Sequence, residues 1–154
     1  VTDIGKEEES VTRLSRVGFD NVQGHLQGGF ATWLAAGKEA DVVDRITAEE
    51  FAAQVNVKED KVIDIRKDTE YAAEHVDEAY NKPLAMINEW VKDINPEEHF
   101  FIHCAGGYRS MIAASILQAR GYRNFTEIAG GFADISKTNV AKTDFVCQTK
   151  IMQA

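Results

Sequence analysis

Three short apolar runs, separated by helical patterns, constrain the fold of this chain most strongly. They are rich in β-branched and aromatic residues and read KVIDI (61–65), FFIHC (100–104) and NFTEI (124–128). Continuous apolar runs of this length are typical of strands buried on both faces. Because helical patterns lie between them, the strands are expected to be parallel and joined by right-handed crossovers. The sequence therefore predicts an α/β fold, a parallel sheet with helices on both faces.

The helical segments carry their own boundary signals. In ITAEEFAAQV, Thr47 and Glu50 have the spacing of a capping box and precede an apolar stripe. Gly121 is expected to end the helix that follows the second strand. Further helices are predicted over residues 67–76, 84–94 and 110–121.

Composition excludes several classes of function. The 154 residues are 44% hydrophobic and 27% charged, enough for one globular domain and some remainder. A net charge of -8 without a block of Lys and Arg argues against nucleic-acid binding. No apolar run is long enough to span a membrane, and no signal-peptide pattern is present. Cys104 and Cys147 lie in unlike contexts, which favours a reducing compartment and a cytoplasmic location.

An internal repeat indicates how the chain is organised. RVGFDNVQGHLQGGFATW (16–33) and ARGYRNFTEIAGGFADI (119–135) share a Gly-aromatic-x-Asn start and a Gly-Gly-Phe-Ala end. We expect helix, turn, strand, turn and helix in both copies. Residues 1–45 are therefore interpreted as the closing part of a preceding module, 46–137 as a complete domain and 138–154 as a C-terminal tail.

The apolar residues of the 1–45 segment would normally face the rest of their own module. A short strand at DNV (20–22) would have no sheet to join. The segment is therefore expected either to dock on the complete domain or to be shared between two chains, as in a homodimer. The apolar residues are Phe19, Val22, Leu26, Phe30, Trp33 and Leu34.

Cys104 lies where a predicted parallel strand ends and a helix begins. Ligands of open parallel sheets bind at this edge, where helix N-termini direct free N–H groups toward them. Gly106 and Gly107 allow the chain to turn its amides inward. A ring of N–H donors would lower the pKa of Cys104 below the free value of about 8.5. A lone cysteine at a strand end is more often a core residue, but its glycines and Arg109 favour a nucleophile.

The other polar residues around this loop have competing interpretations. The guanidinium of Arg109 could anchor an oxyanion or hold the loop in place. His103 points to the opposite face by strand alternation and is interpreted as a satisfied core histidine. For His75 a structural and a functional role are about equally favoured. The histidines show none of the usual ligand spacings, so no metal site is expected.

HCAGGYRS after a strand, together with VIDIR and EHVDEAYNKPL upstream, resembles the rhodanese homology domain over roughly residues 46–137. The resemblance implies a rhodanese-like sheet and a sulfur-carrying Cys104. Asp64 and Arg66 match the signature pair after the first buried strand and are expected to support the loop from below. His75 matches too, although the family's GHIPGA is EHVDEA here. The rest of the loop would be Ala105, Gly106, Gly107, Tyr108, Arg109 and Ser110.

Loop length separates two chemistries within that superfamily. The stretch from Cys104 through Arg109 has six residues, as in sulfurtransferases, whereas the phosphatase relatives have one more. Neither Asp nor Glu occurs between residues 99 and 126 to act as a general acid. We therefore expect a sulfurtransferase that carries a persulfide from a thiosulfate- or persulfide-type donor to a thiol acceptor, without a cofactor. A non-catalytic interaction module is the alternative, and a cysteine phosphatase is less favoured.

The first 45 residues resemble the end of the first rhodanese-like module in bacterial proteins that join a metallo-β-lactamase-fold hydrolase to two such modules. The resemblance implies further domains in a longer parent chain. It also implies a first module without the cysteine. Sliding the repeat back by 103 positions places Val1 where Cys104 stands.

Overall fold

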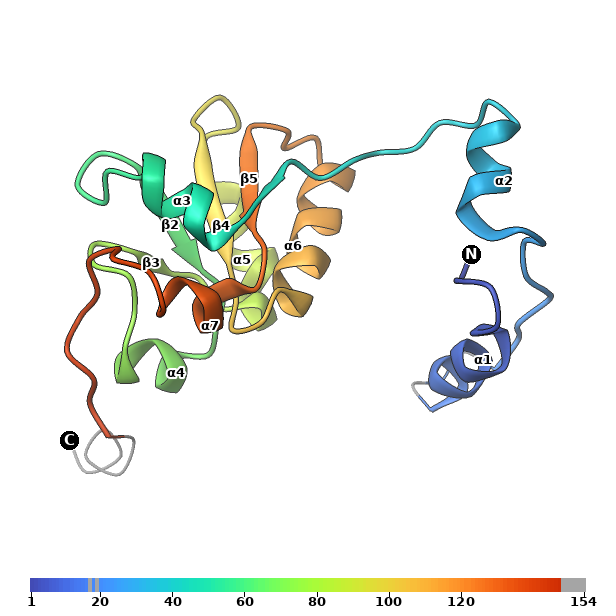
Figure 1. Cartoon of the computed structure of the whole chain (residues 1–154), viewed down its shortest axis with the longest axis horizontal. Coiled ribbons are helices and arrows are strands. Elements are labelled where there is room, and N and C mark those ends of the chain that lie inside the picture. Colours follow the sequence, from blue (N-terminus) through green and yellow to red (C-terminus); the bar gives the residue numbers. More distant parts are fainter. Residues whose placement is uncertain (17, 19, 148–154) are drawn as a thin grey trace. The chain divides into compact units, whose positions relative to one another are not determined.

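Two compact units make up the chain, one over residues 1–42 and one from residue 43 onward. The structure is a computed structural model that describes residues 1–16, 18 and 20–147. Figure 1 labels the helices and strands of both units. No helix among the described residues is long and apolar enough to cross a membrane.

A parallel five-stranded sheet forms the centre of the second unit, in the order β1-β5-β4-β2-β3. Every neighbouring pair is parallel, which confirms the predicted fold class. The apolar runs became β2, β4 and β5, whereas the edge strands β1 and β3 are too short to show a periodic pattern. The strands are β1 (Arg45–Ile46), β2 (Lys61–Asp64), β3 (Tyr80–Asn81), β4 (Phe100–His103) and β5 (Phe125–Ile128).

Helices cover both faces of this sheet (Figure 1). Phe100 and Ile102 of β4 pack with α5 and α6, while Phe101 packs with α3 and α7 on the opposite face. Alternation along the strand thus builds two apolar layers and places Cys104 in the layer beneath α6. The helices are α3 (Ala48–Gln54), α4 (Asp68–Ala73), α5 (Ile87–Trp90), α6 (Tyr108–Ala119) and α7 (Gly131–Ile135), with 3₁₀ turns η1 (Leu84–Met86) and η2 (Val91–Asp93) flanking α5.

Two predicted helix boundaries are confirmed. Thr47 and Glu50 form the capping box, because the side chain of each accepts the backbone N–H of the other. Beyond the last residue of α6, Gly121 takes the left-handed conformation with φ +88°. These local signals operate within a few residues, so the sequence alone specifies them.

Two other helices differ from their predicted extent. The helix predicted over 67–76 ends at Ala73, since Glu74 is extended and its carbonyl accepts a hydrogen bond from Arg66. The helix predicted over 84–94 is one α-helical turn between two 3₁₀ turns. Its apolar residues still face the core, because spacings of three and four residues suit both kinds of helix.

The first unit contains α1 (Glu7–Ser15) and α2 (Gly29–Ala35). The strand predicted at 20–22 does not form, because a strand needs a neighbour to pair its backbone groups. The repeat is nevertheless visible in the backbone. Gly28 precedes α2 with φ +78°, and Gly130 precedes α7 with φ +73°. Both positions require a left-handed conformation that favours glycine.

Apolar side chains of the first unit are exposed on α2. Phe30 and Leu34 are about half exposed, and Trp33 is 38% exposed. Of the other predicted residues, Val22 is exposed and Leu26 is half-buried, while Phe19 lies outside the described residues. That this surface is covered by docking or by a homodimer stays a prediction.

We predict that a shortened chain beginning at Val43 folds without the first unit, because both apolar layers of the sheet come from residues after 42. Circular dichroism should show a cooperative transition for the shortened chain. In light scattering, the ratio of measured mass to monomer mass should be larger for the full chain than for the shortened chain, since the full chain carries the exposed residues of α2. Monomeric masses for both chains would contradict a homodimer through the first unit.

Candidate active site

Cys104 follows the last residue of β4 and begins the loop that leads into α6. Its Sγ accepts the backbone N–H of Gly107 at 3.1 Å and lies 3.5 Å from the hydroxyl of Ser110. Gly107 has φ +91°, which allows the chain to fold back over the sulfur. Cys104 is only 1% exposed, so the sulfur lies inside the loop rather than on its surface.

The surroundings of the sulfur favour the thiolate. Burial raises the pKa of Cys104, but hydrogen bonds from the Ser110 hydroxyl and from the N–H groups of Ser110, Gly106 and Gly107 outweigh it. The pKa of Cys104 therefore lies below the ordinary thiol value. Of the N–H donors predicted from the two glycines, that of Gly107 is directed at Sγ, and such a donor suits a nucleophilic sulfur.

Arg109 connects the loop to α4. Its Nη1 and Nη2 each donate to one carboxylate oxygen of Glu70, at 2.7 and 2.8 Å. The hydrogen bonds from Arg109 hold the pKa of Glu70 below its usual range. These contacts tie the loop to α4, which agrees with one of the two roles considered for Arg109. Tyr108, by contrast, is exposed on the outside of the loop.

α7 closes against the beginning of the loop. The N–H of Phe132 donates to the Cys104 carbonyl at 2.7 Å, and the N–H of Ala133 donates to the Ala105 carbonyl at 2.9 Å. A Cβ on Gly131 would lie 2.4 Å from the Cys104 carbonyl oxygen, well inside contact distance. The Gly-Gly-Phe-Ala end of the repeat thus has a physical role, since α7 can approach the loop only where Gly131 has no side chain.

Asp64 and Arg66 form a buried ion pair on the opposite face of the sheet, against Phe132. The guanidinium of Arg66 donates to both carboxylate oxygens, with a shortest distance of 2.6 Å. It also lies 4.0 Å above the ring of Phe132. The Asp64–Arg66 pair supports the loop through Phe132, whose ring packs against Arg66 and whose N–H binds the Cys104 carbonyl. Removing one partner of such a pair costs roughly 3–5 kcal/mol, which fits a supporting role.

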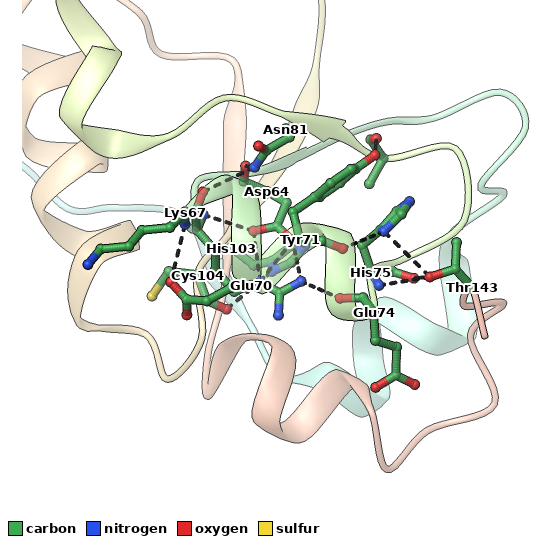
Figure 2. Close-up of polar contacts among 12 residues, drawn as sticks. Asp64, Lys67, Glu70, Tyr71, Glu74, His75, Asn81, His103, Cys104 and Thr143 are labelled. Atoms are coloured by element: carbon green, nitrogen blue, oxygen red, sulfur yellow. Dashed lines mark hydrogen bonds and ion pairs between the residues drawn. The ribbon is translucent and has the colours of Figure 1, made fainter. Parts of the chain in front are cut away.

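His75 lies apart from the cysteine loop, beside Thr143 (Figure 2). Its ring stacks on Tyr71 with centroids 3.6 Å apart, and its Nδ1 lies 2.7 Å from the Tyr71 carbonyl. The backbone of His75 exchanges hydrogen bonds with Thr143. These contacts hold the segment after α7 against the end of α4, so His75 supports the C-terminal segment and not the sulfur.

His103 is buried on the face predicted for it, next to the Asp64–Arg66 pair. Its Nδ1 lies 3.2 Å from the Cys104 carbonyl. Its Nε2 has no hydrogen-bond partner in the described part of the chain and lies 4.0 Å from Asp64. The predicted buried position of His103 is therefore correct. The prediction that its ring nitrogens are hydrogen-bonded is wrong for Nε2. Burial lowers the pKa of His103, which keeps the imidazole neutral.

The sequence prediction missed Glu127, which lies behind the loop. Its Oε1 accepts the Ser110 hydroxyl proton at 2.5 Å, and its Oε2 accepts from Arg45 Nε at 2.6 Å. Glu127 is fully buried. A carboxylate inside a buried strand was the available signal, because alternation from Phe125 places it on the Cys104 face. Among the described residues, no three His, Cys, Asp or Glu side chains are grouped to hold a metal ion.

A parallel sheet whose central strand ends in a cysteine loop is the arrangement expected of a rhodanese-like protein. A family model for the rhodanese-like domain matches residues 47–138, and the chain belongs to that family. The thiosulfate sulfurtransferase PspE of Escherichia coli (strain K12) is 35% identical over 80 residues, covering 51% of this chain and 76% of PspE.

More distant similarities extend over about two thirds of the chain. YrkF of Bacillus subtilis (strain 168) is 24% identical over 100 residues, which cover 64% of this chain, and the chain spans 54% of YrkF. In fold, the chain is similar to a rhodanese-related protein of Thermoplasma volcanium, with a TM-score of 0.58 and 23% identity. That likeness covers 65% of this chain and 97% of the other.

We predict that iodoacetamide labels Cys104 faster than Cys147 at pH 7, because hydrogen bonds to Sγ hold the pKa of Cys104 below the ordinary thiol value and leave more thiolate at that pH. The advantage should shrink as the pH rises and the thiol of Cys147 ionises as well. Peptide mass spectrometry after timed labelling measures both sites in one sample. Identical pH profiles for the two thiols would contradict an activated Cys104.

Proposed function

We propose that the protein is a sulfurtransferase that carries sulfur on Cys104. The Cys104 thiolate attacks the outer sulfur of a donor such as thiosulfate, and the S–S bond of the donor breaks. Sulfite leaves with the electron pair of that bond, and Cys104 becomes a persulfide. An acceptor thiolate then attacks the outer sulfur, and Cys104 leaves as the thiolate.

The observation that carries this proposal is the N–H of Gly107 directed at Sγ from 3.1 Å. Backbone donors that favour the thiolate can equally stabilise the negative charge of a persulfide. The family and the likeness to a protein named thiosulfate sulfurtransferase support the same chemistry. Thiosulfate, a glutathione persulfide and a protein persulfide all fit as donors, and a small thiol or a protein thiol fits as acceptor.

A cysteine phosphatase is less well supported by the side chains around the loop. Arg109, which could otherwise bind a phosphate with two parallel hydrogen bonds, uses both terminal nitrogens on Glu70. That engagement also leaves Glu70 poorly placed as a general acid. The carboxylate of Glu127 is buried behind the loop, away from the position of a leaving group.

We further propose that the first unit is a copy of the closing part of this fold without a nucleophile. A Cβ on Gly29 would lie 3.1 Å from the Thr2 carbonyl, as a Cβ on Gly131 would lie near the Cys104 carbonyl. The backbone thus favours Thr2, one residue beyond Val1, as the counterpart of Cys104. A threonine hydroxyl cannot form a persulfide, so sulfur chemistry belongs to the second unit.

Intact mass spectrometry tests the sulfurtransferase proposal. After incubation with thiosulfate or glutathione persulfide, the protein should gain one sulfur atom, and Cys104→Ala should lose this gain while remaining folded. Cys147→Ala is the matched control and should still take up sulfur. Sulfur on the Cys104→Ala variant would place the chemistry elsewhere. A folded wild type that accepts sulfur from no donor would favour the non-catalytic interaction module.

A further inference from the structure

The hydroxyl of Ser110 has one proton and three neighbouring acceptors. Glu127 Oε1 lies 2.5 Å from the hydroxyl oxygen, the Gly107 carbonyl 3.0 Å and Cys104 Sγ 3.5 Å. A hydrogen bond to a carboxylate is about twice as strong as one between neutral groups. When the carboxylate of Glu127 is ionised, the Ser110 hydroxyl therefore donates its hydrogen bond to Glu127. The lone pairs of the Ser110 oxygen then face the sulfur. In this state a hydrogen bond between the two groups runs from the Cys104 thiol to the Ser110 oxygen.

The carboxylate of Glu127 is held in place from its other side. Arg45 on β1 donates its Nε–H to Oε2 at 2.6 Å, and the arginine side chain is 46% exposed. Glu127 itself is fully buried. Contacts thus run without a break from the buried sulfur through Ser110 and Glu127 to a guanidinium at the surface.

We propose that Glu127 is a positioning residue that receives the thiol proton of Cys104 through Ser110. The S–H bond breaks and its proton passes to the Ser110 oxygen, while the O–H bond of Ser110 breaks and that proton passes to Glu127 Oε1. The electron pair of the S–H bond stays on sulfur. The product is a thiolate, a serine hydroxyl and a neutral carboxylic acid. One negative charge moves from Glu127 to sulfur, and the total charge does not change.

This transfer accounts for two features of the site. Cys104 is 1% exposed, so its proton needs an internal acceptor. After the transfer Ser110 donates to the sulfur, and that hydrogen bond is one of those that favour the thiolate. The inference rests on the proposed function, because it explains how a buried Cys104 becomes a nucleophile.

The other charged groups near the path are already paired or neutral. On the Cys104 side, Arg109 of α6 is bound to Glu70. On the opposite face of the sheet, Arg66 is bound to Asp64. Burial holds the pKa of His103 below its ordinary value, which keeps this imidazole neutral in most of the range tested below.

The test is the rate at which iodoacetamide labels Cys104 in the full chain between pH 5 and 9, with Cys147→Ser as background. A pair of groups that shares one proton titrates in two steps. The wild type should therefore show a plateau of reactivity at low pH, where internal transfer supplies thiolate, and a second rise at higher pH. Glu127→Gln should lose the plateau and show one step, falling about tenfold per pH unit below its midpoint.

A second variant changes the same path in the opposite direction. Arg45→Gln removes the positive charge beside Glu127, which makes the carboxylate a better proton acceptor and should raise the low-pH plateau severalfold. Lys61→Gln is the matched control, because Lys61 forms a 2.7 Å ion pair with Glu98 that has no connection to the loop. Its profile should superimpose on that of the wild type.

A single-step profile in the wild type would overturn the proposal. So would Glu127→Gln and Arg45→Gln profiles that match the wild type. If Glu127→Gln does not fold, Arg45→Gln decides the question, because the Arg45 side chain is partly exposed and its replacement leaves no cavity in either apolar layer. Alkylation uses no sulfur donor, so the result is distinct from a failure of sulfur transfer.

Discussion

The fixed end of β4 is the constraint on which the rest of the site depends. β4 lies between β2 and β5, so both of its edges are hydrogen-bonded and its end cannot shift without disturbing two ladders. At that end the Cys104 carbonyl also accepts the N–H of Phe132 from α7. Cys104 thus extends from backbone that is held on three sides. One short turn through Gly107 then suffices to direct an N–H at its sulfur.

The two faces of the sheet contribute different chemistry to that end. On the Cys104 face, Ser110 and Glu127 surround the sulfur with groups that can exchange a proton. On the other face, the Asp64–Arg66 pair has its charges balanced and supports α7 through Phe132. Buried charge that is paired and hydrogen-bonded supplies rigidity, whereas we propose that the carboxylate one hydroxyl away from the thiol supplies reactivity.

Much of the fold and of the cysteine loop could be predicted from residues that are close in sequence. The three buried strands β2, β4 and β5, the capping box at Thr47 and the glycine turn after Cys104 follow from local spacing, and the structure contains all of them. Glu127 and Glu70 escaped prediction because their partners, Ser110 and Arg109, lie 17 and 39 residues away along the chain. His75 has the family's residue type, yet its ring is engaged by Tyr71 and Thr143.

The amino-acid sequence is enough to place Cys104 at the end of a buried parallel strand, next to glycines able to turn amides toward it. Strand burial, turns and helix caps depend on residue type over a few positions, and these are written along the chain. The identity of the carboxylate behind Ser110, and of the one that binds Arg109, becomes clear only from the folded chain. Those pairings depend on strand order and helix placement, which bring β1 and β5 together behind α6 and α4 beside the loop. Distances between side chains on separate elements are set by packing, and no local pattern contains them.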